Sequence, residues 1–269
     1  MIKIIAMDLD GTLFLPDHKT VAEENKKALR VAHEAGIKLA VATGRTYSTI
    51  GDICEQVPEI DYIIFSNGAG VYDRKSGRIV YHNVMPFELC DKLLPLAVTK
   101  CRLAELYIGG RAYALKKPGG ELDKEVLPPV FRPMLGKEIG IVEDYHFDDG
   151  VEKAIFFFGD DGECRETADK IKECGEVFVT SSIPCSFEFT KAGVDKGEAL
   201  LALCKIIGAS ADEAMAFGDA ENDIPMLRAA GCGIAMDNAD DETKASAKYV
   251  TASNAEFGVA LAINKYAFC

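Results

Sequence analysis

The most constraining feature of this chain is an apolar segment at its start that runs directly into two aspartates. The apolar run over residues 2–7 is followed by Asp8 and Asp10, ahead of Gly11 and Thr12. A short apolar run that stops at turn residues is typical of a strand buried in a parallel sheet. Ligands bind at the carboxyl ends of such strands. The pattern therefore predicts two site carboxylates, although Asp and Gly are also ordinary wherever a strand turns.

The same pattern occurs twice more in the first third of the chain. Apolar runs over residues 37–42 and 62–65 end at Thr43 and Ser66, again with polar residues at the carboxyl end. Residues with helical spacing of apolar side chains separate the runs. Three successive strand-and-helix units predict an α/β fold with a doubly wound, mostly parallel sheet and right-handed crossovers. The same rhythm resumes from Asp195 to the C-terminus.

Capping patterns predict where several helices begin. They are Thr20 with Glu23, Asp195 with Glu198, and Ser253 with Glu256. Another helix is expected over residues 47–56.

The middle of the chain does not follow this rhythm. Residues 71–73 and 78–82 alternate like a hairpin, and the stretch from 84 to about 184 mixes short strand-like and helix-like runs. One of these is a helix over residues 87–101, interrupted by Pro95. An α+β domain inserted into the α/β domain fits this pattern best. The domain boundaries that follow are 1–83 and 190–269 for the core and 84–189 for the inserted cap.

Composition limits the partners and the compartment. The 269 residues carry a formal net charge of −13, and neither nucleic acid nor an anionic membrane attracts an acidic surface. No apolar run approaches the ~20 residues of a membrane span, and the N-terminus lacks the pattern of a signal peptide, so a cytoplasmic location is expected. The nine cysteines show no zinc-ligand or disulfide pattern and are expected to be small buried hydrophobes.

Polar clusters stand at the carboxyl ends of at least three of the expected core strands. Asp8 and Asp10 follow the first strand, Thr43 the second, and Asp219 a later one, while Lys196 lies at a helix start. Phosphoryl transfer needs a nucleophile, donors to the phosphate oxygens, an acid for the leaving group and a divalent cation. Clustered carboxylates repel one another without a cation, and Mg²⁺ prefers such oxygen ligands. The clusters therefore favour Mg²⁺-assisted phosphoryl chemistry.

Four ordered motifs resemble those of the haloacid dehalogenase superfamily, and the closest branch is the Cof-like sugar-phosphate phosphatases. The motifs are Asp8-Leu-Asp-Gly-Thr-Leu13, Ala42-Thr-Gly-Arg45, Gly193-Val-Asp-Lys196 and Gly218-Asp-Ala-Glu-Asn-Asp223. The match extends to Asn67-Gly68-Ala69 and to the segment ending at Asn254, so it covers both core segments. The resemblance implies a Rossmann-like core with an inserted α+β cap.

The resemblance also implies roles for individual residues. Asp8 is expected to be the nucleophile that forms an aspartyl-phosphate, and Asp10 the acid and base. The phosphate-binding or substrate-binding positions are Leu9, Thr43, Gly44, Lys196 and Asn222. The Mg²⁺ ligands are Asp8, Asp10 through its backbone carbonyl, Asp219 and Asp223, with Asp223 either a direct or an outer ligand.

Two other residue types bear on the same site. Arg45 is expected mainly to pair with a neighbouring acid rather than to gather phosphate. The four histidines have no metal-ligand spacing, and His33 is expected to be structural.

The sequence thus predicts a Mg²⁺-dependent phosphatase acting on a small phosphorylated metabolite, with a cap that determines specificity. The substrate stays open among hexose phosphates, pyridoxal phosphate, flavin mononucleotide and others, and so does the oligomeric state. Two alternatives remain. One is a phosphosugar mutase with the same chemistry, and the other is a non-catalytic sensor that binds phosphorylated metabolites.

Overall fold

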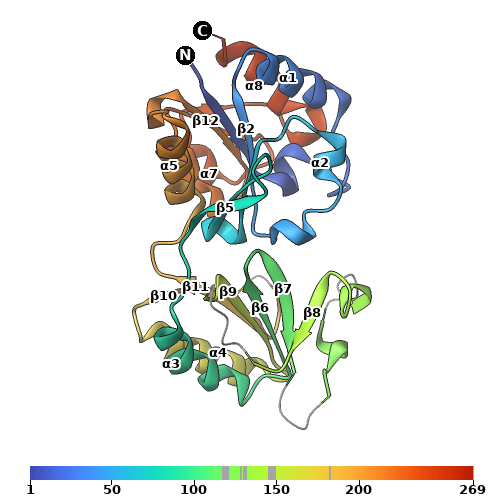
Figure 1. Ribbon diagram of the computed structural model, residues 1–269, viewed down its shortest axis with the longest axis vertical. Helices are drawn as coiled ribbons and strands as arrows, with labels where there is room; N and C mark the ends of the chain where they lie inside the picture. The colour runs from blue at the N-terminus through green and yellow to red at the C-terminus, as the bar shows by residue number, and fades with distance from the viewer. Residues whose placement is uncertain (117–120, 128, 130–131, 145–149, 182, 269) are drawn as a thin grey trace. The chain divides into compact units, whose positions relative to one another are not determined.

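The computed structural model describes the chain except for residues 117–120, 128, 130–131, 145–149, 182 and 269 (Figure 1). Its contacts divide the chain into two compact units. Unit 1 consists of Met1–Arg45, Ile50–His82 and Asp195–Cys269, and unit 2 of Thr46–Thr49 and Asn83–Val194. These ranges differ from the expected domain boundaries at 46–49, at residue 83 and at 190–194.

Unit 1 is built on an eight-stranded sheet with the order β14-β13-β12-β1-β2-β3-β4-β5. The strands are β1 (Ile4–Met7), β2 (Lys38–Ala42), β3 (Tyr62–Phe65), β4 (Gly70–Asp73), β5 (Arg78–His82), β12 (Ala214–Gly218), β13 (Cys232–Ala235) and β14 (Tyr249–Val250). From β14 to β3 all neighbours are parallel, and the β3–β4 and β4–β5 pairs are antiparallel. The predicted parallel sheet and hairpin are therefore confirmed.

The order of the parallel strands reverses between β1 and β12. The chain passes from β1 outward to β2 and β3, and later from β12 outward to β13 and β14 on the other side. In open α/β sheets this reversal leaves a crevice at the carboxyl ends of the two central strands. The sheet order thus singles out the segments after Met7 and after Gly218 as the place for a ligand site.

Helices cover both faces of this sheet. They are α1 (Glu23–Glu34), α2 (Ile53–Gln56), α5 (Lys196–Ile207), α6 (Ile224–Ala229), α7 (Asp241–Ser246) and α8 (Gly258–Tyr266). Ile4 and Ala6 share a core with Leu200 of α5, while Ile5 and Met7, which point to the opposite face, are equally buried. Helices α1 and α8 pack against each other, and they lie on the face of the sheet opposite α5 (Figure 1).

Unit 2 contains a six-stranded sheet with the order β10-β11-β9-β6-β7-β8. Its strands are β6 (Leu103–Ile108), β7 (Arg111–Leu115), β8 (Ile139–Val142), β9 (Lys153–Phe157), β10 (Val177–Thr180) and β11 (Ser186–Lys191), and its helices are α3 (Phe87–Val98) and α4 (Asp161–Lys172). All neighbouring strands are antiparallel except β7 and β8. The predicted α+β class of the inserted segment matches these elements.

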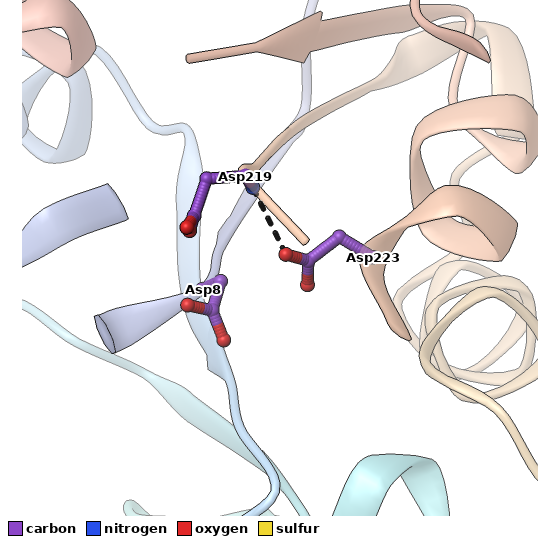
Figure 2. Close-up of side chains that lie close together, drawn as sticks. All are labelled: Asp8, Asp219 and Asp223. Atoms are coloured by element: carbon purple, nitrogen blue, oxygen red, sulfur yellow. Dashed lines mark hydrogen bonds between the residues drawn. The ribbon is translucent and has the colours of Figure 1, made fainter. Parts of the chain in front are cut away.

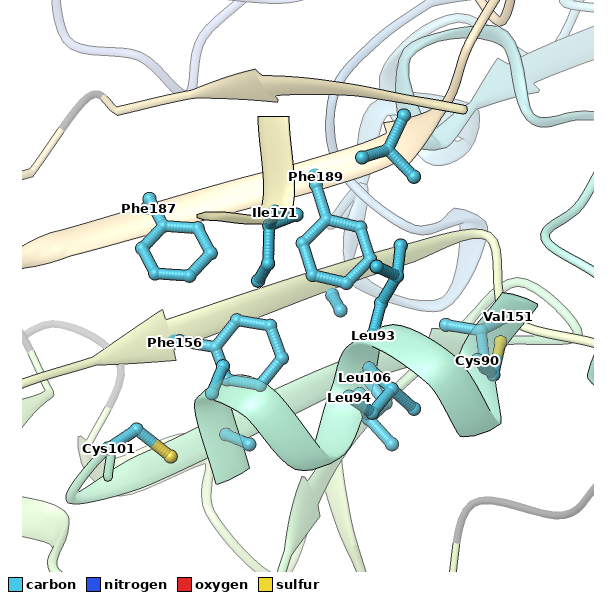
Figure 3. Close-up of a cluster of buried hydrophobic side chains, with 14 of the residues drawn as sticks. Cys90, Leu93, Leu94, Cys101, Leu106, Val151, Phe156, Ile171, Phe187 and Phe189 are labelled. Carbon is cyan, nitrogen blue, oxygen red and sulfur yellow. The ribbon is translucent and has the colours of Figure 1, made fainter. Parts of the chain in front are cut away.

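The core of unit 2 lies between its two helices and one face of the sheet. Figure 3 shows Leu93 and Leu94 of α3 and Ile171 of α4 facing Phe156 and Phe189. The ring centroids of these two phenylalanines lie 5.6 Å apart in a stacked arrangement. Unit 2 therefore has a hydrophobic core of its own.

Some expected helix boundaries are wrong. The first helix begins at Glu23 with Ala22 as its uncapped N-cap residue, because the Thr20 hydroxyl donates to Asp17 Oδ2 at 2.5 Å instead. The helix expected over 47–56 is only a 3₁₀ turn at Tyr47–Thr49 followed by α2, and Gly51 between them has a φ of +71°. These errors arise where side chains bond within turns, which helical spacing does not reveal.

Two other helices also differ from expectation. The helix that contains Pro95 runs through it and ends at Val98 rather than at residue 101. Ser253 only precedes a 3₁₀ turn at Asn254–Glu256, where its hydroxyl donates to Glu256 Oε2 at 2.9 Å and does not cap the backbone. The last helix begins after Phe257, whose φ is +62°.

None of the eight cysteines in the part of the chain that the structure describes is paired in a disulfide there. Five of them are buried, and Cys54, Cys174 and Cys185 are only half-buried. Among the described helices, none is both long enough and apolar enough to cross a membrane.

Candidate active site

Two aspartates lie at the carboxyl ends of the two central strands of unit 1. Asp8 follows β1 and Asp219 follows β12, and these strands are parallel neighbours. The Asp8 N–H donates to the Phe217 carbonyl at 3.0 Å, so the sheet ladder reaches the first site residue. Figure 2 shows both carboxylates together with that of Asp223, which follows in the turn after β12. The two central strands therefore both end at this group of acids.

Lys196 lies between two of these acids. Its Nζ is 2.6 Å from Asp8 Oδ1 and 2.6 Å from Asp223 Oδ1, and its side chain is fully buried. The N-terminal end of a helix disfavours a cation, yet Lys196 begins α5, so the two carboxylates must offset that cost. Asp195 caps the same helix by accepting from the Glu198 N–H at 2.8 Å, as its sequence predicts.

Burial dominates the electrostatics of the cluster. Desolvation raises the pKa of Asp8 despite the neighbouring charge of Lys196, and the negative charge of Asp223 raises it further. Burial alone would lower the pKa of Lys196, but the charges of Asp223 and Asp8 outweigh it and raise that pKa. Desolvation also raises the pKa of Asp219. One ammonium therefore does not fully compensate three partly desolvated carboxyl groups, and an additional cation would relieve the imbalance.

The three acids have the geometry of a cation site. Asp8, Asp219 and Asp223 can each offer one carboxylate oxygen within 4.8 Å of the others. Hard oxygen donors of this kind suit Mg²⁺, so the donor set fits the ion that the sequence predicts.

The oxygens of Asp223 are already engaged. Its Oδ1 accepts from Lys196, and its Oδ2 accepts from the N–H groups of Asp219 and Ala220 at 3.0 and 3.1 Å. Asp219, in contrast, has one recorded side-chain bond, from the Thr12 hydroxyl to Oδ1 at 2.6 Å. Asp223 thus fixes the turn and the lysine, whereas Asp8 and Asp219 each retain an oxygen with no partner recorded in the described part of the chain.

Asp10 points away from this cluster. Its Oδ1 accepts from Arg45 Nη2 at 2.6 Å and lies 3.2 Å from His18 Nδ1, while its Oδ2 accepts from Arg45 Nε at 3.0 Å. Its carboxylate is absent from the cation cluster, as expected if only its backbone carbonyl is a ligand. The expected pairing of Arg45 with a neighbouring acid is present in the structure, and its partner is Asp10.

The turn that carries Asp10 is closely packed. Leu9–Leu13 form an irregular turn in which Asp10 and Gly11 have non-helical backbone angles, and the φ of Gly11 is +87°. A Cβ at Gly11 would lie 2.2 Å from Asp219 Oδ2. Leu9 has a fully buried side chain, so its expected contact with phosphate would come from its backbone.

Side chains from the far end of the chain hold this turn. Asn238 Nδ2 donates to the Gly11 carbonyl and Asn254 Nδ2 donates to the Phe14 carbonyl, both at 2.8 Å. Sequence reasoning gave no role to Asn238, His18 or Thr12. Asn254 stands in a segment that resembles the family but received no role, since its partner lies 240 residues away.

A second polar group gathers beside the first, after β2, β3 and β12. Asn222 Nδ2 donates to Asn67 Oδ1 at 3.1 Å, and a Cβ at Gly44 would lie 3.0 Å from that same oxygen. Thr43 is buried, and its Oγ1 accepts from the Arg45 N–H at 3.1 Å. The expected phosphate-binding residues Thr43, Gly44 and Asn222 therefore share one neighbourhood, organised around Asn67.

The comparisons with known proteins cover nearly the whole chain. Residues 5–263 match the family model of the haloacid dehalogenase-like hydrolases. The chain is 30% identical over 265 residues to a 5-amino-6-(5-phospho-D-ribitylamino)uracil phosphatase of Bacillus subtilis strain 168, a match that covers 98% of this chain and 96% of that protein. The chain belongs to the haloacid dehalogenase-like hydrolase family.

Other relatives of this haloacid dehalogenase-like hydrolase carry different substrate names. It is 29% identical over 268 residues to a pyridoxal phosphate phosphatase of Escherichia coli K12, with 96% of each chain covered. A solved subclass IIB sugar phosphatase of the superfamily matches with a TM-score of 0.76 and 25% identity over 98% of both chains. These matches confirm the resemblance and the Rossmann-like α/β class that the motifs predict.

Proposed function

We propose that this hydrolase is a Mg²⁺-dependent phosphatase that hydrolyses small phosphomonoesters through an aspartyl-phosphate on Asp8. The observation that carries the proposal is that two acids, Asp8 and Asp10, have different surroundings. Asp8 lies buried against Lys196 and the cation cluster, while Asp10 stands apart on an arginine and a histidine. A nucleophile and a proton donor need such different surroundings.

The nucleophile is Asp8. Lys196 holds its Oδ1 at 2.6 Å and so orients the carboxylate, one oxygen of which forms the bond to phosphorus. The electron pair of the breaking P–O bond goes to the ester oxygen, which Asp10 protonates as the alcohol leaves. Asp10 then takes a proton from the water that attacks phosphorus, which releases phosphate and restores Asp8.

The remaining polar residues bind the transferring group. Lys196 balances the charge of Asp8 and of the phosphoryl oxygens. Thr43, Gly44 and Asn222 donate hydrogen bonds to those oxygens, with Asn67 orienting Asn222. A group held on every side in this way loses little orientational freedom during the reaction.

Asp8, Asp219 and the backbone carbonyl of Asp10 are the proposed Mg²⁺ ligands. Asp223 is proposed as an outer ligand that holds Lys196 and the turn in place, because Lys196 and two backbone N–H groups already use its oxygens. When bound, the ion supplies positive charge for the phosphoryl oxygens and for the nucleophile.

The substrate is a small phosphorylated metabolite, as the names of the relatives indicate for those proteins. The group that a ribitylaminouracil phosphate, pyridoxal phosphate and the sugar phosphates all present to a phosphatase is the phosphomonoester. The identity to each named relative is similar, so similarity does not favour one substrate. We assign specificity to the inserted α+β unit, which contains none of the four motifs that supply the site residues.

The test is phosphate release by purified protein with and without Mg²⁺, first from p-nitrophenyl phosphate and then from a panel of phosphorylated metabolites ranked by kcat/KM. Asp8→Asn is expected to abolish turnover, and chelation of the ion to do the same. Retained activity in Asp8→Asn overturns the mechanism. Conversion of one sugar phosphate into its isomer without net phosphate release identifies a mutase, and binding of the panel without turnover identifies a sensor.

A further inference from the structure

The residues that follow the turn Leu9–Leu13 form a short hairpin, which places a histidine beside Asp10. Phe14 and Val21 form an isolated antiparallel bridge, and the Leu15 N–H donates to the Thr20 carbonyl at 2.8 Å. Between them the His18 N–H donates to the Leu15 carbonyl at 2.9 Å. This segment is therefore a tight hairpin with His18 at its tip.

The tip is fixed by Asp17. Its carboxylate accepts from the N–H groups of Lys19 and Thr20, at 3.0 and 2.8 Å, and from the Thr20 hydroxyl. His18 has a φ of +56°, a left-handed conformation that costs a residue with a Cβ about 1 kcal/mol or more. The side chain of His18 is 64% exposed, so burial of its ring does not account for this cost.

The imidazole of His18 faces Asp10. His18 Nδ1 lies 3.2 Å from Asp10 Oδ1, and in the tautomer that carries its hydrogen on Nδ1 the ring donates to that oxygen. Arg45 bonds both oxygens of the same carboxylate and lies 5.7 Å from the Phe14 ring centroid. Oδ1 thus receives two donors and Oδ2 one.

We propose that His18 is a positioning residue for Asp10. Together with Arg45 it fixes the direction of the carboxylate and supplies Oδ1 with two donors, so that Oδ2, which accepts only from Arg45 Nε, is the oxygen that exchanges a proton with the leaving group. This inference rests on the proposed function of Asp10 as acid and base. It adds a residue from the hairpin, outside the four family motifs, to the set that governs proton transfer.

A plain surface ion pair is the alternative explanation, since such pairs contribute about 0–1 kcal/mol to stability and nothing to catalysis. The two explanations predict different changes in rate for different substrates when the His18 contact is lost. An alkyl alcohol leaves only when it is protonated, whereas p-nitrophenolate leaves without a proton. Loss of Asp10 positioning therefore slows transfer from an alkyl phosphate more than transfer from p-nitrophenyl phosphate, while loss of a structural contact slows both alike.

The decisive variants are His18→Gly and His18→Asn. Glycine accepts the positive φ but removes the donor. Asparagine also tolerates that backbone and places an amide N–H at the position of Nδ1. His33→Asn is the matched control, because His33 also faces an acid, with Nε2 at 3.6 Å from Asp61 Oδ2, but lies on α1.

The measurement is the single-turnover rate of phosphoenzyme formation with Mg²⁺, using p-nitrophenyl phosphate and the alkyl monophosphate that the wild type hydrolyses fastest in the panel. For His18→Gly we expect about a five- to tenfold loss with the alkyl ester, a small part of what general acids contribute, with KM unchanged. The loss with p-nitrophenyl phosphate is expected to be under about twofold, and His18→Asn is expected to recover most of the alkyl rate.

Equal rates for His18→Gly and His18→Asn, or equal losses on both esters, overturn the role of His18. The wild type serves as the separate control for the proposed function. If it transfers no phosphoryl group from either ester, the phosphatase assignment fails. If it does and the variants match it, only the inference about His18 fails.

Discussion

Lys196 is the residue on which the charge balance of the site depends. Its ammonium is fully buried between Asp8 and Asp223, where a lone charge would be costly. A buried charge is tolerated only with partners, and removal of one partner leaves the others uncompensated.

Lys196→Met is therefore expected to lower the free energy of unfolding by about 3–5 kcal/mol and turnover by at least about 10²-fold, as loss of a main electrostatic contact does. Urea unfolding without Mg²⁺ and steady-state kinetics with it provide the two measurements. Lys3→Met is the control, because Lys3 pairs with Glu213 at 2.9 Å on the surface and its loss costs under about 1 kcal/mol. Wild-type stability in Lys196→Met would contradict this account of the buried lysine.

The two acids after β12 differ in their expected effect on Mg²⁺. Asp219→Asn removes a charge from an oxygen that has no recorded partner, whereas the oxygens of Asp223 serve Lys196 and the turn. Loss of an outer partner of a metal ligand already costs about 10–100-fold in affinity. We therefore expect Asp219→Asn, which removes a direct ligand charge, to raise the Mg²⁺ concentration for half-maximal activity by at least about tenfold and by more than Asp223→Asn does. Titration of activity against Mg²⁺ gives the comparison, and the reverse order would make Asp223 the direct ligand.

At the scale of elements, the turn after β1 is where local sequence and long-range contacts meet. Gly11 is required twice, by its φ of +87° and by the space that Asp219 occupies. Gly36, just after α1, has a nearly identical φ of +89° but nothing near its missing side chain. A comparison of alanine substitutions at Gly11 and Gly36 therefore separates the effect of backbone strain from the effect of packing in the site.

Gly11→Ala is expected to abolish activity, because the new methyl group displaces the Asp219 carboxylate. Gly36→Ala is expected to lower the free energy of unfolding by about 1–2 kcal/mol, the cost of a left-handed backbone for alanine, and to leave kcat unchanged. Thermal unfolding and phosphate release from both variants test this. An active Gly11→Ala protein would show that the turn adapts without moving Asp219.

The strand ends were predictable from sequence because an apolar run that stops at polar residues is a local pattern. Asp8, Thr43 and Asp219 each stand at such a stop, and the sheet order then brings them to one edge. The contacts of Asn238 and Asn254 were not predictable, since each joins the turn to a segment more than 200 residues away. The helix cap predicted at Thr20 is wrong for the opposite reason, because the Thr20 hydroxyl donates to a nearby acid, Asp17, in the preceding turn.

At the scale of the whole molecule, the two units have separate cores and separate titrating groups. In unit 2, burial raises the pKa of Glu105 on β6 from 4.5 to about 7, against the lowering effect of Lys153, and the charge of Glu188 raises it further. A carboxyl whose pKa is higher in the folded state binds its proton more tightly there than in the unfolded chain. Folding stability therefore falls as pH rises from about 4.5 to about 7, and the cost is fully present above that range.

Glu105→Gln removes this cost, because the amide stays neutral at every pH. We expect the variant to gain stability over the wild type as pH rises from 5 to 8.5, by up to about 3 kcal/mol at the upper end. Urea unfolding of both proteins across this range, followed by a probe in unit 2, measures the gain. Glu143→Gln, at an exposed carboxylate that pairs with Lys116 at 3.1 Å, is expected to show no such trend. A difference between Glu105→Gln and wild type that does not change with pH would mean that Glu105 stays ionised in the folded protein, held by Lys153 despite its burial.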